Sequence, residues 1–472
     1  MGLGLHGGGV ESARYLAGKG AEVTVTDLRD EKVLAPSIEK LNAFQIRYVL
    51  GRHEMEDFLN ADMVIMNPGV KPDSPYIKAA RRIETDISLF LAANKCEVLA
   101  VTGSKGKSTT SSALHYALNE CLAAGQNRKQ PGKKVWLGGN ITISPLSFLD
   151  ELDEKDTVVL ELSSWQLGIL GTRDLLKPRA AIITTIMRDH LDRYGTMENY
   201  VNDKRLIYRN QDEQDVTVAK DDDWGMSFHR ESRGRPLVFS DSPLNEGLNG
   251  GWIADPKGPG LARLWEIPGA GSACPGNKAF GSIVEVVPNK PFVPGYHQKK
   301  NLLSAALALL DLGIDAELIR DSLGRFPGIE HRLEFFHESA GIRFYNDTAA
   351  TIPEAAAAAI NAFDNPSNIV LVCGGTDKDL QFKPLVEAAA NVKAIVLLAG
   401  TGTEKLTPLL DSAGLKYSGP FNSMEPAINV ALNSAAPGDT VILSPGCSSF
   451  GLFLNEFDRG RQWKEGVRRL AP

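Results

Sequence analysis

A short glycine-rich segment carries the residue types that bind phosphate. Residues 101–109 read Val-Thr-Gly-Ser-Lys-Gly-Lys-Ser-Thr and follow an apolar run that predicts a strand. Glycines let backbone N–H groups turn toward phosphate oxygens, and the N-terminus of a following helix adds positive potential. Lys107 would pair with β- and γ-phosphate oxygens, and the Ser108 hydroxyl would reach Mg2+. We expect ATP contacts at Gly103, Ser104, Lys105, Gly106, Lys107, Ser108 and Thr109.

Acidic and histidine side chains follow two further apolar runs. Glu161 closes the run 157–161, and Asp189-His190 comes soon after the run 180–185. Carboxyl ends of parallel strands meet at the edge where ligands bind in open α/β sheets, so Glu161 and His190 are placed to hold magnesium. An ordinary exposed loop is the alternative for Glu161, and a structural histidine is the alternative for His190.

The elements that position these residues are those of parallel sheets. The runs 97–102, 157–161 and 180–185 are continuously apolar and are separated by helical lengths, which predicts a sheet covered on both faces. Residues from about 240 to 294 are rich in Gly and Pro and predict loops with a small antiparallel extension. From residue 301 the strand-then-helix order resumes and predicts a Rossmann-like domain. Its strands are expected at 342–345, 368–373, 394–398 and 440–443.

The first 92 residues also alternate strand-like and helix-like pieces, with strands expected at 21–27 and 62–67. They predict a partial Rossmann-like domain. Gly2 to Gly9 reads as the turn of a strand–helix unit, yet only Met1 precedes it. We therefore expect a start site assigned too late or a trimmed chain, with a strand before this turn.

Length and composition bound the class of protein. The length of 472 residues predicts three domains, with two or four as alternatives, and the pattern of strands and helices predicts α/β domains at 1–92, 93–298 and 299–472. The net charge of −7 argues against a nucleic-acid or anionic-membrane surface. No apolar run approaches the roughly 20 residues that span a bilayer. The five cysteines are scattered, which indicates a reducing cytoplasm and no structural zinc.

Together the motifs resemble the Mur ligase family over essentially the whole chain. The segment TGSKGKST is similar to that family's TGTxGKST loop, and ELSSWQL followed by DHLDRYGTMENYVNDKRLIY is most similar to the members that add glutamate to UDP-N-acetylmuramoyl-L-alanine. Further matching segments, in order, are GGN at 138–140, GYHQKKN at 295–301, HR at 331–332, YNDTAAT at 345–351, GGTDK at 374–378 and SPGCSSF at 444–450.

The resemblance implies roles at the matching positions. By itself Lys204, on a predicted helix, indicates a solvated lysine. The family pattern instead makes it a carbamylated lysine that helps Glu161, His190 and Ser108 bind magnesium. The residues implied to complete the ATP site are Asn301, Arg332 and Asp347. Those implied to bind the UDP-linked substrate are Leu5, His6, Asp27, Arg29, Asn140 and Ser163. Those implied to bind the carboxylates of glutamate are Thr351, Lys378 and Ser449, with Phe457 near them.

Two departures from the family pattern concern the acceptor amino acid. Ala349 stands where the family usually has lysine, and Glu456 stands where it commonly has an aromatic residue, beside Phe457. A carboxylate facing the glutamate side chain would repel it. Either Phe457 takes the aromatic role or the amino-acid pocket is rearranged, so the stereochemistry of the accepted glutamate stays open.

The resemblance implies an ATP- and Mg2+-dependent ligase that forms an amide through an acyl phosphate, in the synthesis of peptidoglycan precursors. Its partners would be small molecules, with no nucleic acid or membrane, and the protein would be a cytoplasmic monomer. A ligase that adds L-glutamate and a folylpolyglutamate-synthase-like ligase are alternatives within the class. A phosphate-loop kinase and a non-catalytic nucleotide-binding protein are the alternatives outside it; a ligase consumes ATP only with both substrates present.

Overall fold

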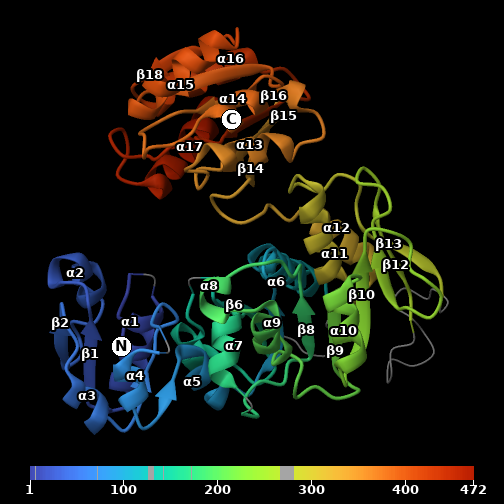
Figure 1. The fold of residues 1–472 in the computed structure, drawn as a ribbon. Coiled ribbons are helices and arrows are strands. Elements are labelled where there is room, and N and C mark those ends of the chain that lie inside the picture. The colour runs from blue at the N-terminus through green and yellow to red at the C-terminus, as the bar shows by residue number, and fades with distance from the viewer. Residues whose placement is uncertain (6, 72, 126–131, 142, 172, 266–280) are drawn as a thin grey trace. The chain divides into compact units, whose positions relative to one another are not determined.

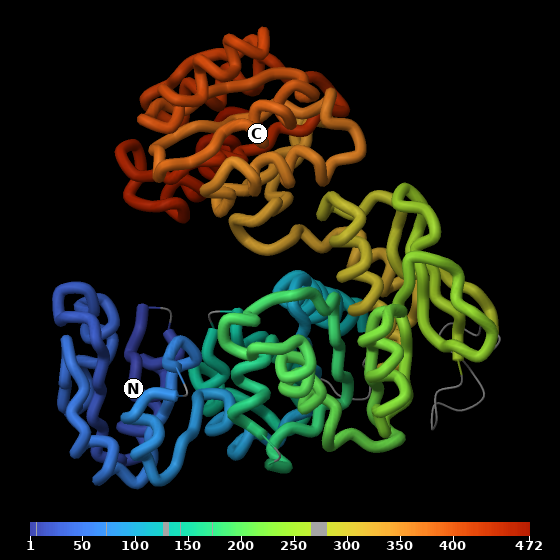
Figure 2. The backbone as a smooth tube through the Cα atoms, in the orientation of Figure 1, coloured from blue at the N-terminus to red at the C-terminus, as the bar shows by residue number. Residues whose placement is uncertain are grey.

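The computed structural model describes residues 1–5, 7–71, 73–125, 132–141, 143–171, 173–265 and 281–472 (Figure 1). The chain divides into two compact units. The first contains residues 1–254, 260–286 and 301–322, and the second contains 255–259, 287–300 and 323–472. Figure 2 follows the backbone as a tube, with the N-terminal residues in blue and the C-terminal unit in orange and red.

The first unit is built on a nine-stranded sheet in the order β13-β12-β11-β10-β9-β8-β5-β7-β6. Its strands are β5 (Glu97–Thr102), β6 (Val135–Gly139), β7 (Thr157–Glu161), β8 (Ala180–Ile183), β9 (Val216–Lys220), β10 (Arg235–Ser240), β11 (Gly250–Trp252), β12 (Gly260–Arg263) and β13 (Ile283–Val287). Every pair from β6 through β11 is parallel. β11 pairs with β12 in antiparallel fashion, which confirms the small antiparallel extension.

Helices cover this sheet and bury its strands. The residues of β7 and β8 are all buried, as a parallel sheet with two covered faces requires. The helices of this part are α6 (Lys107–Ala123), α7 (Ser164–Leu170), α8 (Leu191–Tyr194), α9 (Met197–Arg205), α10 (Asp223–Glu231), α11 (Tyr296–Asp311) and α12 (Ala316–Gly324). The chain passes from one unit to the other within α11.

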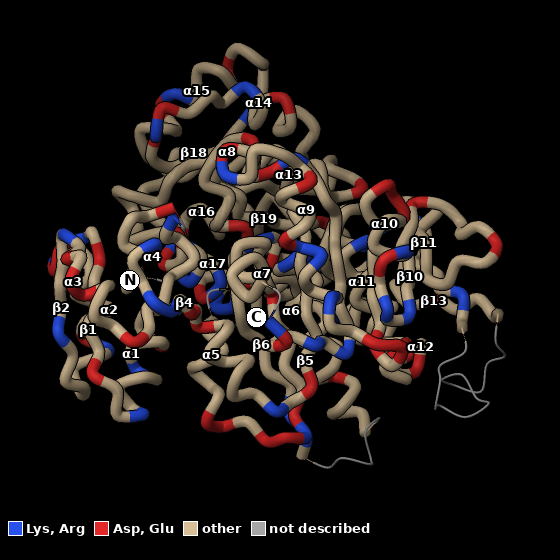
Figure 3. The backbone as a smooth tube through the Cα atoms, turned by 60° about the horizontal axis from the view of Figure 1, so that its bottom comes forward, with Lys and Arg blue, Asp and Glu red and all other residues tan. Residues whose placement is uncertain are grey.

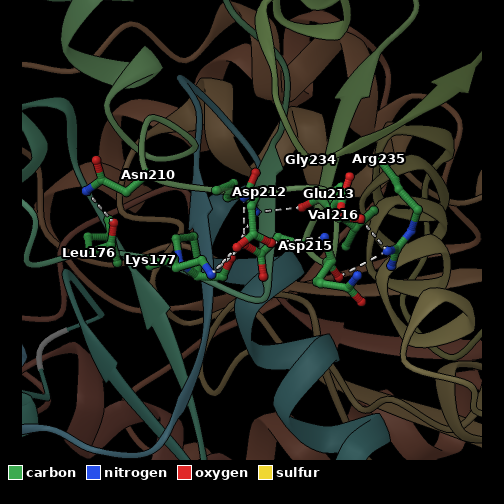
Figure 4. A network of polar contacts seen from close by, with 12 residues as sticks. Leu176, Lys177, Asn210, Asp212, Glu213, Asp215, Val216, Gly234 and Arg235 are labelled. Carbon is green, nitrogen blue, oxygen red and sulfur yellow. Dashed lines mark hydrogen bonds and ion pairs between the residues drawn. The ribbon is translucent and has the colours of Figure 1, made fainter. Parts of the chain in front are cut away.

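Polar contacts fix the loop that enters β9 (Figure 4). Lys177 donates to Asp212 at 2.5 Å, and the Arg235 guanidinium donates to the carbonyl oxygen of Glu213 at 2.8 Å. The same guanidinium donates to the carboxylate of Asp311 at 2.6 Å, which ties α11 to the sheet. Asp311 is fully buried, so this pair is shielded from water.

The N-terminal part of the first unit has two pairs of parallel strands. They are β1 (Val23–Asp27) with β2 (Ile46–Leu50), and β3 (Val64–Ile65) with β4 (Ile83–Glu84). Its helices are α1 (Gly8–Gly18), α2 (Glu31–Glu39), α3 (Met55–Asn60), α4 (Pro75–Ala79) and α5 (Asp86–Ala93). A reciprocal cap between Thr85 and Ser88 begins α5, whose apolar side chains pack into the core of the nine-stranded sheet.

A cavity of about 590 Å³ lies beside β1 and β3. Two residues bridge these strands at the cavity wall. The Met1 ammonium donates to the carbonyl oxygen of Ile65 at 2.9 Å, and the Gly2 N–H donates to that of Thr26 at 2.8 Å. Burial lowers the pKa of the Met1 amine to about 6, an effect that Asp27 opposes. The strand expected before this turn stays a prediction.

The second unit is a six-stranded sheet in the order β14-β15-β19-β16-β17-β18. Its strands are β14 (Glu334–Ser339), β15 (Ile342–Asn346), β16 (Ile369–Cys373), β17 (Ala394–Leu398), β18 (Ser418–Phe421) and β19 (Thr440–Leu443). β14 and β15 are antiparallel, and the other pairs are parallel. The helices are α13 (Pro353–Asn361), α14 (Lys383–Ala389), α15 (Thr401–Ser412), α16 (Met424–Ser434) and α17 (Glu456–Leu470).

The strands predicted from apolar runs are confirmed, and β5, β7, β17 and β19 have the predicted bounds. The short strand β3 spans only two of the six residues expected around it. Acidic and basic residues are interspersed along the chain (Figure 3). Among the described residues, no helix combines the length and the hydropathy that a membrane span needs.

Candidate functional site

The phosphate loop, residues 102–109, joins β5 to α6 as its sequence predicts. Gly103 and Gly106 have φ angles of 145° and 92°, a backbone region that L side chains rarely adopt. A Cβ at Gly103 would lie 1.9 Å from Oγ1 of Thr184, and one at Gly106 would lie 2.3 Å from Oδ1 of Asn301. Conformation and space therefore both require glycine. The second contact also brings the predicted Asn301 to the loop.

Lys107 folds back over this loop. Its ammonium donates to the carbonyl oxygens of Gly103 at 3.0 Å and of Ser104 at 3.1 Å. Burial lowers the pKa of Lys107, and the negative charge of Glu161 opposes that shift. Its position over the loop suits a cation that pairs with phosphate oxygens.

The loop is held by the chain that follows β8. The backbone N–H of Ser104 donates to the carbonyl oxygen of Thr185 at 2.9 Å, and the Ser104 hydroxyl lies 3.0 Å from that of Tyr200. Lys105 is exposed and forms an ion pair with Asp189 at 3.5 Å. The contacts of Ser104 and Lys105 with residues after β8 thus hold the loop in place. Ser108 and Thr109 lie in the first turn of α6, where the helix N-terminus favours anions.

Glu161 carries a buried carboxylate oxygen that lacks a partner. The side chain is only 1% exposed, and its Oε1 accepts a hydrogen bond from Nδ2 of Asn140 at 2.9 Å. Its Oε2 is buried and has no hydrogen-bond partner among the residues that the structure describes. An unpaired buried carboxylate oxygen is costly, and a divalent cation is a ligand that satisfies it. The donor set at Glu161 therefore fits magnesium.

Lys204 is buried at the same loop, and this corrects the reading of Lys204 by itself as a solvated lysine. It is 1% exposed, and its ammonium donates to the carbonyl oxygen of Gly103 at 2.9 Å, the same oxygen that Lys107 uses. Among the described residues it forms no ion pair. Burial, followed by the charge of Lys107, lowers the pKa of Lys204 to about 7, against the opposing charges of Asp189 and Asp203.

His190 begins helix α8 with a left-handed φ of 53°. Its side chain is 49% exposed, and its ring centroid lies 5.8 Å from that of Trp165 and 6.1 Å from that of Tyr200. The Arg193 guanidinium lies 3.4 Å from the Trp165 ring centroid. The imidazole is thus accessible beside aromatic rings, and the ligand role predicted for it stays a prediction.

Ser163 has a local structural role. Its hydroxyl accepts a hydrogen bond from the backbone N–H of Gln166 at 3.2 Å, and the Gln166 side chain accepts one from the Ser163 N–H at 2.9 Å. This reciprocal cap begins α7 and is worth about 1 kcal/mol in typical helices. The substrate role predicted for Ser163 stays a prediction.

Of the residues predicted to bind the UDP moiety, Asp27 organises the glycine turn. Its Oδ2 accepts a hydrogen bond from the Gly4 N–H at 3.1 Å, and its Oδ1 accepts one from the Arg29 N–H at 2.9 Å. Leu5 is 45% exposed. His6 lies outside the described residues. Leu5, Asp27 and Arg29 do not line the 590 Å³ cavity.

In the second unit, Asp347 lies just beyond β15. Its carboxylate accepts hydrogen bonds from the Ser444 hydroxyl at 2.6 Å and from the Leu333 N–H at 3.1 Å. Burial raises the pKa of Asp347 to about 7, although these two bonds and the charge of Arg332 oppose the shift. Arg332 is exposed.

Three loops of the second unit bring the predicted glutamate-binding residues together. We call these the acceptor loops: residues 347–351, 374–378 and 444–450, which follow β15, β16 and β19. The Gly446 N–H donates to the carbonyl oxygen of Ala350 at 2.8 Å, and the Thr376 N–H donates to that of Ser448 at 2.9 Å.

The three predicted side chains differ in exposure. Lys378 is exposed, with its Nζ 5.2 Å from the ring centroid of Phe450, and Thr351 is half-buried. Ser449 is 3% exposed, and its hydroxyl has no hydrogen-bond partner in the described part of the chain. A buried hydroxyl without a partner is available to a ligand.

Of the two departures from the family pattern, Ala349 lies within an acceptor loop and Glu456 lies at the start of helix α17. The Ala349 N–H donates to the carbonyl oxygen of His331 at 3.0 Å. Glu456 begins α17, and its carbonyl oxygen accepts a hydrogen bond from the Thr348 hydroxyl at 2.8 Å. Phe457 is 49% exposed and packs on the His331 ring at 5.3 Å between centroids.

Sequence reasoning missed Arg459, which is fully buried beneath the acceptor loops. Its guanidinium donates to the carbonyl oxygens of Thr348 and Cys447. A sequence signal existed: Arg459, Trp463 and Val467 recur at the spacing of one helix face, and all three are buried.

Three family models match the chain. They are Mur ligase MurD-like, N-terminal domain, over residues 1–88; Mur ligase middle domain, over 101–247; and Mur ligase, glutamate ligase domain, over 331–447. The three matches follow the order of three α/β domains.

Curated relatives match over the full chain. The UDP-N-acetylmuramoylalanine--D-glutamate ligase of Borreliella burgdorferi (strain ZS7) is 40% identical over 100% of this chain and 97% of its own length. The ligase of the same name from Treponema pallidum (strain Nichols) is 39% identical, over 99% of this chain and 96% of its own length.

Solved structures share the fold at lower identity. UDP-N-acetylmuramate-alanine ligase MurC from Thermotoga maritima has a TM-score of 0.53 at 20% identity, over 99% of this chain and 98% of its own. MurF ligase from Thermotoga maritima, solved in complex with ADP, has a TM-score of 0.50 at 17% identity, over 97% and 98%.

Lys107→Ala tests the phosphate loop. We expect ATP turnover to fall by at least about a hundredfold, because loss of one charged group that stabilises the transition state typically costs several kcal/mol. The side chain of Lys107 is half-buried. We still expect it to fold, since the lost bonds join only the loop to itself. Phosphate release and thermal unfolding measure both effects.

Lys95→Ala is the matched control, because this exposed lysine lies just before β5 and pairs with Glu154 at the surface. It should leave turnover and unfolding unchanged. Turnover of Lys107→Ala within about threefold of the unmodified protein would contradict the role given to the loop.

Proposed function

The chain belongs to the Mur ligase family, and we propose that it joins glutamate to UDP-N-acetylmuramoyl-L-alanine with ATP, as the names of its relatives indicate for them. One observation of the structure carries this proposal. A phosphate loop, an unpaired carboxylate oxygen of Glu161 and the buried Lys204 meet at one edge of a parallel sheet. That arrangement suits phosphoryl transfer, in which positioning and charge supply most of the catalysis.

In the proposed reaction, the γ-phosphoryl group of ATP passes to the terminal carboxylate of the UDP-linked substrate. Lys107 would hold phosphate oxygens and balance their charge, and backbone N–H groups at the start of α6 would orient them. The amine of glutamate then attacks the acyl phosphate, the amide bond forms, and inorganic phosphate leaves.

Magnesium fits the same edge of the sheet. We propose that Glu161, His190, Ser108 and modified Lys204 hold it, on the strength of the unpaired Glu161 oxygen. Bound there, Mg2+ would neutralise charge on the transferring phosphoryl group. Asn140 donates to the other oxygen of Glu161 and thus orients its carboxylate.

We propose that Lys204 is carbamylated. A pKa of about 7 leaves much of the Lys204 amine neutral at physiological pH, whereas the amine of an exposed lysine is almost fully protonated there. The neutral nitrogen can add to CO2 and lose a proton to solvent, so that a carbamate anion replaces an ammonium. This exchange removes the repulsion between Lys204 and Lys107 at the Gly103 carbonyl oxygen.

The modification has a defined pH dependence. Burial lowers the pKa of Lys204 to about 7, so the reactive neutral amine accumulates as the pH rises through that value. At a fixed concentration of dissolved CO2, we expect carbamylation of Lys204 to increase over the same range. Carbon-13 NMR with labelled CO2 measures it, and Lys204→Ala should remove the signal together with nearly all activity.

The surface residue Lys177 is the matched control, since it is about half exposed and pairs with Asp212. Lys177→Ala should keep both the carbamate signal and turnover. Acetate should partly restore Lys204→Ala by filling the vacated anion site. A fully active Lys204→Ala protein, or an unmodified ammonium at every pH, would remove Lys204 from the magnesium site.

The acceptor is proposed to be D-glutamate. Both curated relatives described above are named for that amino acid. The acceptor loops supply one exposed ammonium at Lys378 and a hydroxyl at Ser449 that has no partner within the described ranges, with Thr351 nearby. A dianionic amino acid needs such donors, because an unpaired buried carboxylate costs several kcal/mol.

We expect phosphate release only with ATP, UDP-N-acetylmuramoyl-L-alanine and glutamate together, and faster with D- than with L-glutamate. Lys378→Ala should raise the KM for glutamate by at least about tenfold, since a charged hydrogen bond is worth about 1.5–3 kcal/mol. It should leave the KM for the UDP substrate nearly unchanged. Equal rates with both stereoisomers would overturn the choice of D, and preference for alanine or a diamino acid would overturn glutamate.

Further parts of the proposal concern organisation. We propose domains at 1–92, 93–298 and 299–472, and the three family matches fall within these bounds. We also propose that Leu5, His6, Asp27 and Arg29 contact the UDP moiety, and that Arg332 and Asp347 complete the ATP site. The protein would work as a cytoplasmic monomer on small molecules, without nucleic acid or membrane.

A further inference from the structure

Arg459 is a buried cation at the start of α17. It is 0% exposed, and it lies one turn from Trp463 on the face of the helix that packs against the sheet. Its guanidinium has no ion-pair partner among the described residues. Burial lowers the pKa of Arg459 to about 10, an effect that Cys447 and Glu456 oppose, so the group stays charged near neutral pH.

The guanidinium fastens two acceptor loops together and lies against the third. Its Nε donates to the Thr348 hydroxyl at 3.0 Å, and its Nη2 donates to the Thr348 carbonyl oxygen at 2.9 Å. Its Nη1 donates to the Cys447 carbonyl oxygen at 3.1 Å. A Cβ added at Gly375, in the remaining loop, would lie 3.6 Å from Nη1.

Each of these loops carries one residue of the proposed glutamate site. Thr348 lies three positions before Thr351, Cys447 lies two before Ser449, and Gly375 lies three before Lys378. A guanidinium offers several donors in one plane, so it can fix the spacing of these backbones as a single ammonium cannot.

Charge gives Arg459 a second effect. Residues 347–351, 374–378 and 444–450 contain one basic residue, Lys378, for an amino acid with two carboxylates. All three hydrogen-bond acceptors of Arg459 are neutral oxygens, and among the described residues no carboxylate forms an ion pair with it. The charge of Glu456 acts on it without such a contact. A cation without an ion pair in a low-dielectric interior attracts an anionic ligand at longer range than one in water does.

We propose that Arg459 is the positioning residue of the acceptor site: it holds the loops of Thr351 and Ser449 in place, and its charge favours a dicarboxylate amino acid. This inference rests on the proposed function. Arg459 acts through the loops and is not a catalytic residue, so its effect belongs in the KM for glutamate and in the preference for glutamate over uncharged analogues.

The test compares Arg459→Gln, Arg459→Lys and the unmodified protein, with glutamate and with glutamine as its neutral isostere. We expect Arg459→Gln to raise the KM for glutamate by about tenfold or more and to reduce the glutamate/glutamine ratio of kcat/KM by a similar factor. Arg459→Lys should raise the KM for glutamate less and keep the glutamate/glutamine ratio of kcat/KM. A lysine keeps the positive charge but loses the several planar donors of the guanidinium. The KM values for ATP and the UDP substrate should stay within about twofold.

Arg461→Gln is the matched control. Arg461 lies on the same helix two positions later, is exposed, and pairs at the surface with Asp458 at 3.4 Å. Arg461→Gln should leave the KM and kcat values for all substrates unchanged. If Arg459→Gln fails to fold, Arg459→Lys still decides: equal increases in the KM values of all three substrates would overturn the inference.

The proposed function and this inference fail in different ways. If the unmodified protein does not turn over glutamate, the proposed function is wrong. If it does, and Arg459→Gln lowers only the unfolding midpoint while the glutamate/glutamine ratio is unchanged, Arg459 is a structural residue and the inference is wrong.

Discussion

The carbonyl oxygen of Gly103 accepts hydrogen bonds from two ammonium groups, and the candidate site of the first unit is arranged around this contact. Lys107 reaches it from α6, and Lys204 reaches it from α9. Burial lowers the pKa of both lysines, and the charge of Lys107 lowers the pKa of Lys204 further. Anions relieve this cost, and the phosphates of a nucleotide would supply them on one side and a carbamate on the other.

Candidate functional residues lie at equivalent places in the sheets of both units. Polar residues follow parallel strands, and loops from neighbouring strands meet at one sheet edge. In the first unit Gly103 follows β5, Glu161 is the last residue of the adjacent strand β7, and Thr184 follows β8 on the other side of β5. In the second unit the acceptor loops follow β15, β19 and β16, which are also adjacent.

Much of this could be predicted because it is local in sequence. The phosphate loop, the strands that end at or near Glu161 and Asp347 and the alternation of strands with helices follow from apolar runs and glycine spacing. What could not be predicted depends on contacts between distant residues. Lys204 and Gly103 are 101 positions apart, and by itself the lysine reads as solvated. Arg459 and Thr348 are 111 positions apart, and only the helical spacing of buried neighbours indicated that Arg459 faces inward.

Lys204 and Arg459 are both buried cations that form no ion pair with a carboxylate in the described part of the chain, and their different chemistry suits different tasks. A lysine amine loses its proton when burial lowers its pKa to about 7, and a neutral amine can then be converted to an anion. A guanidinium keeps its charge even when burial lowers its pKa to about 10. The first property would suit the proposed magnesium site, where a second fixed positive charge would oppose binding of the metal. The second would suit the proposed glutamate site, where a loss of charge would remove the attraction for a dicarboxylate.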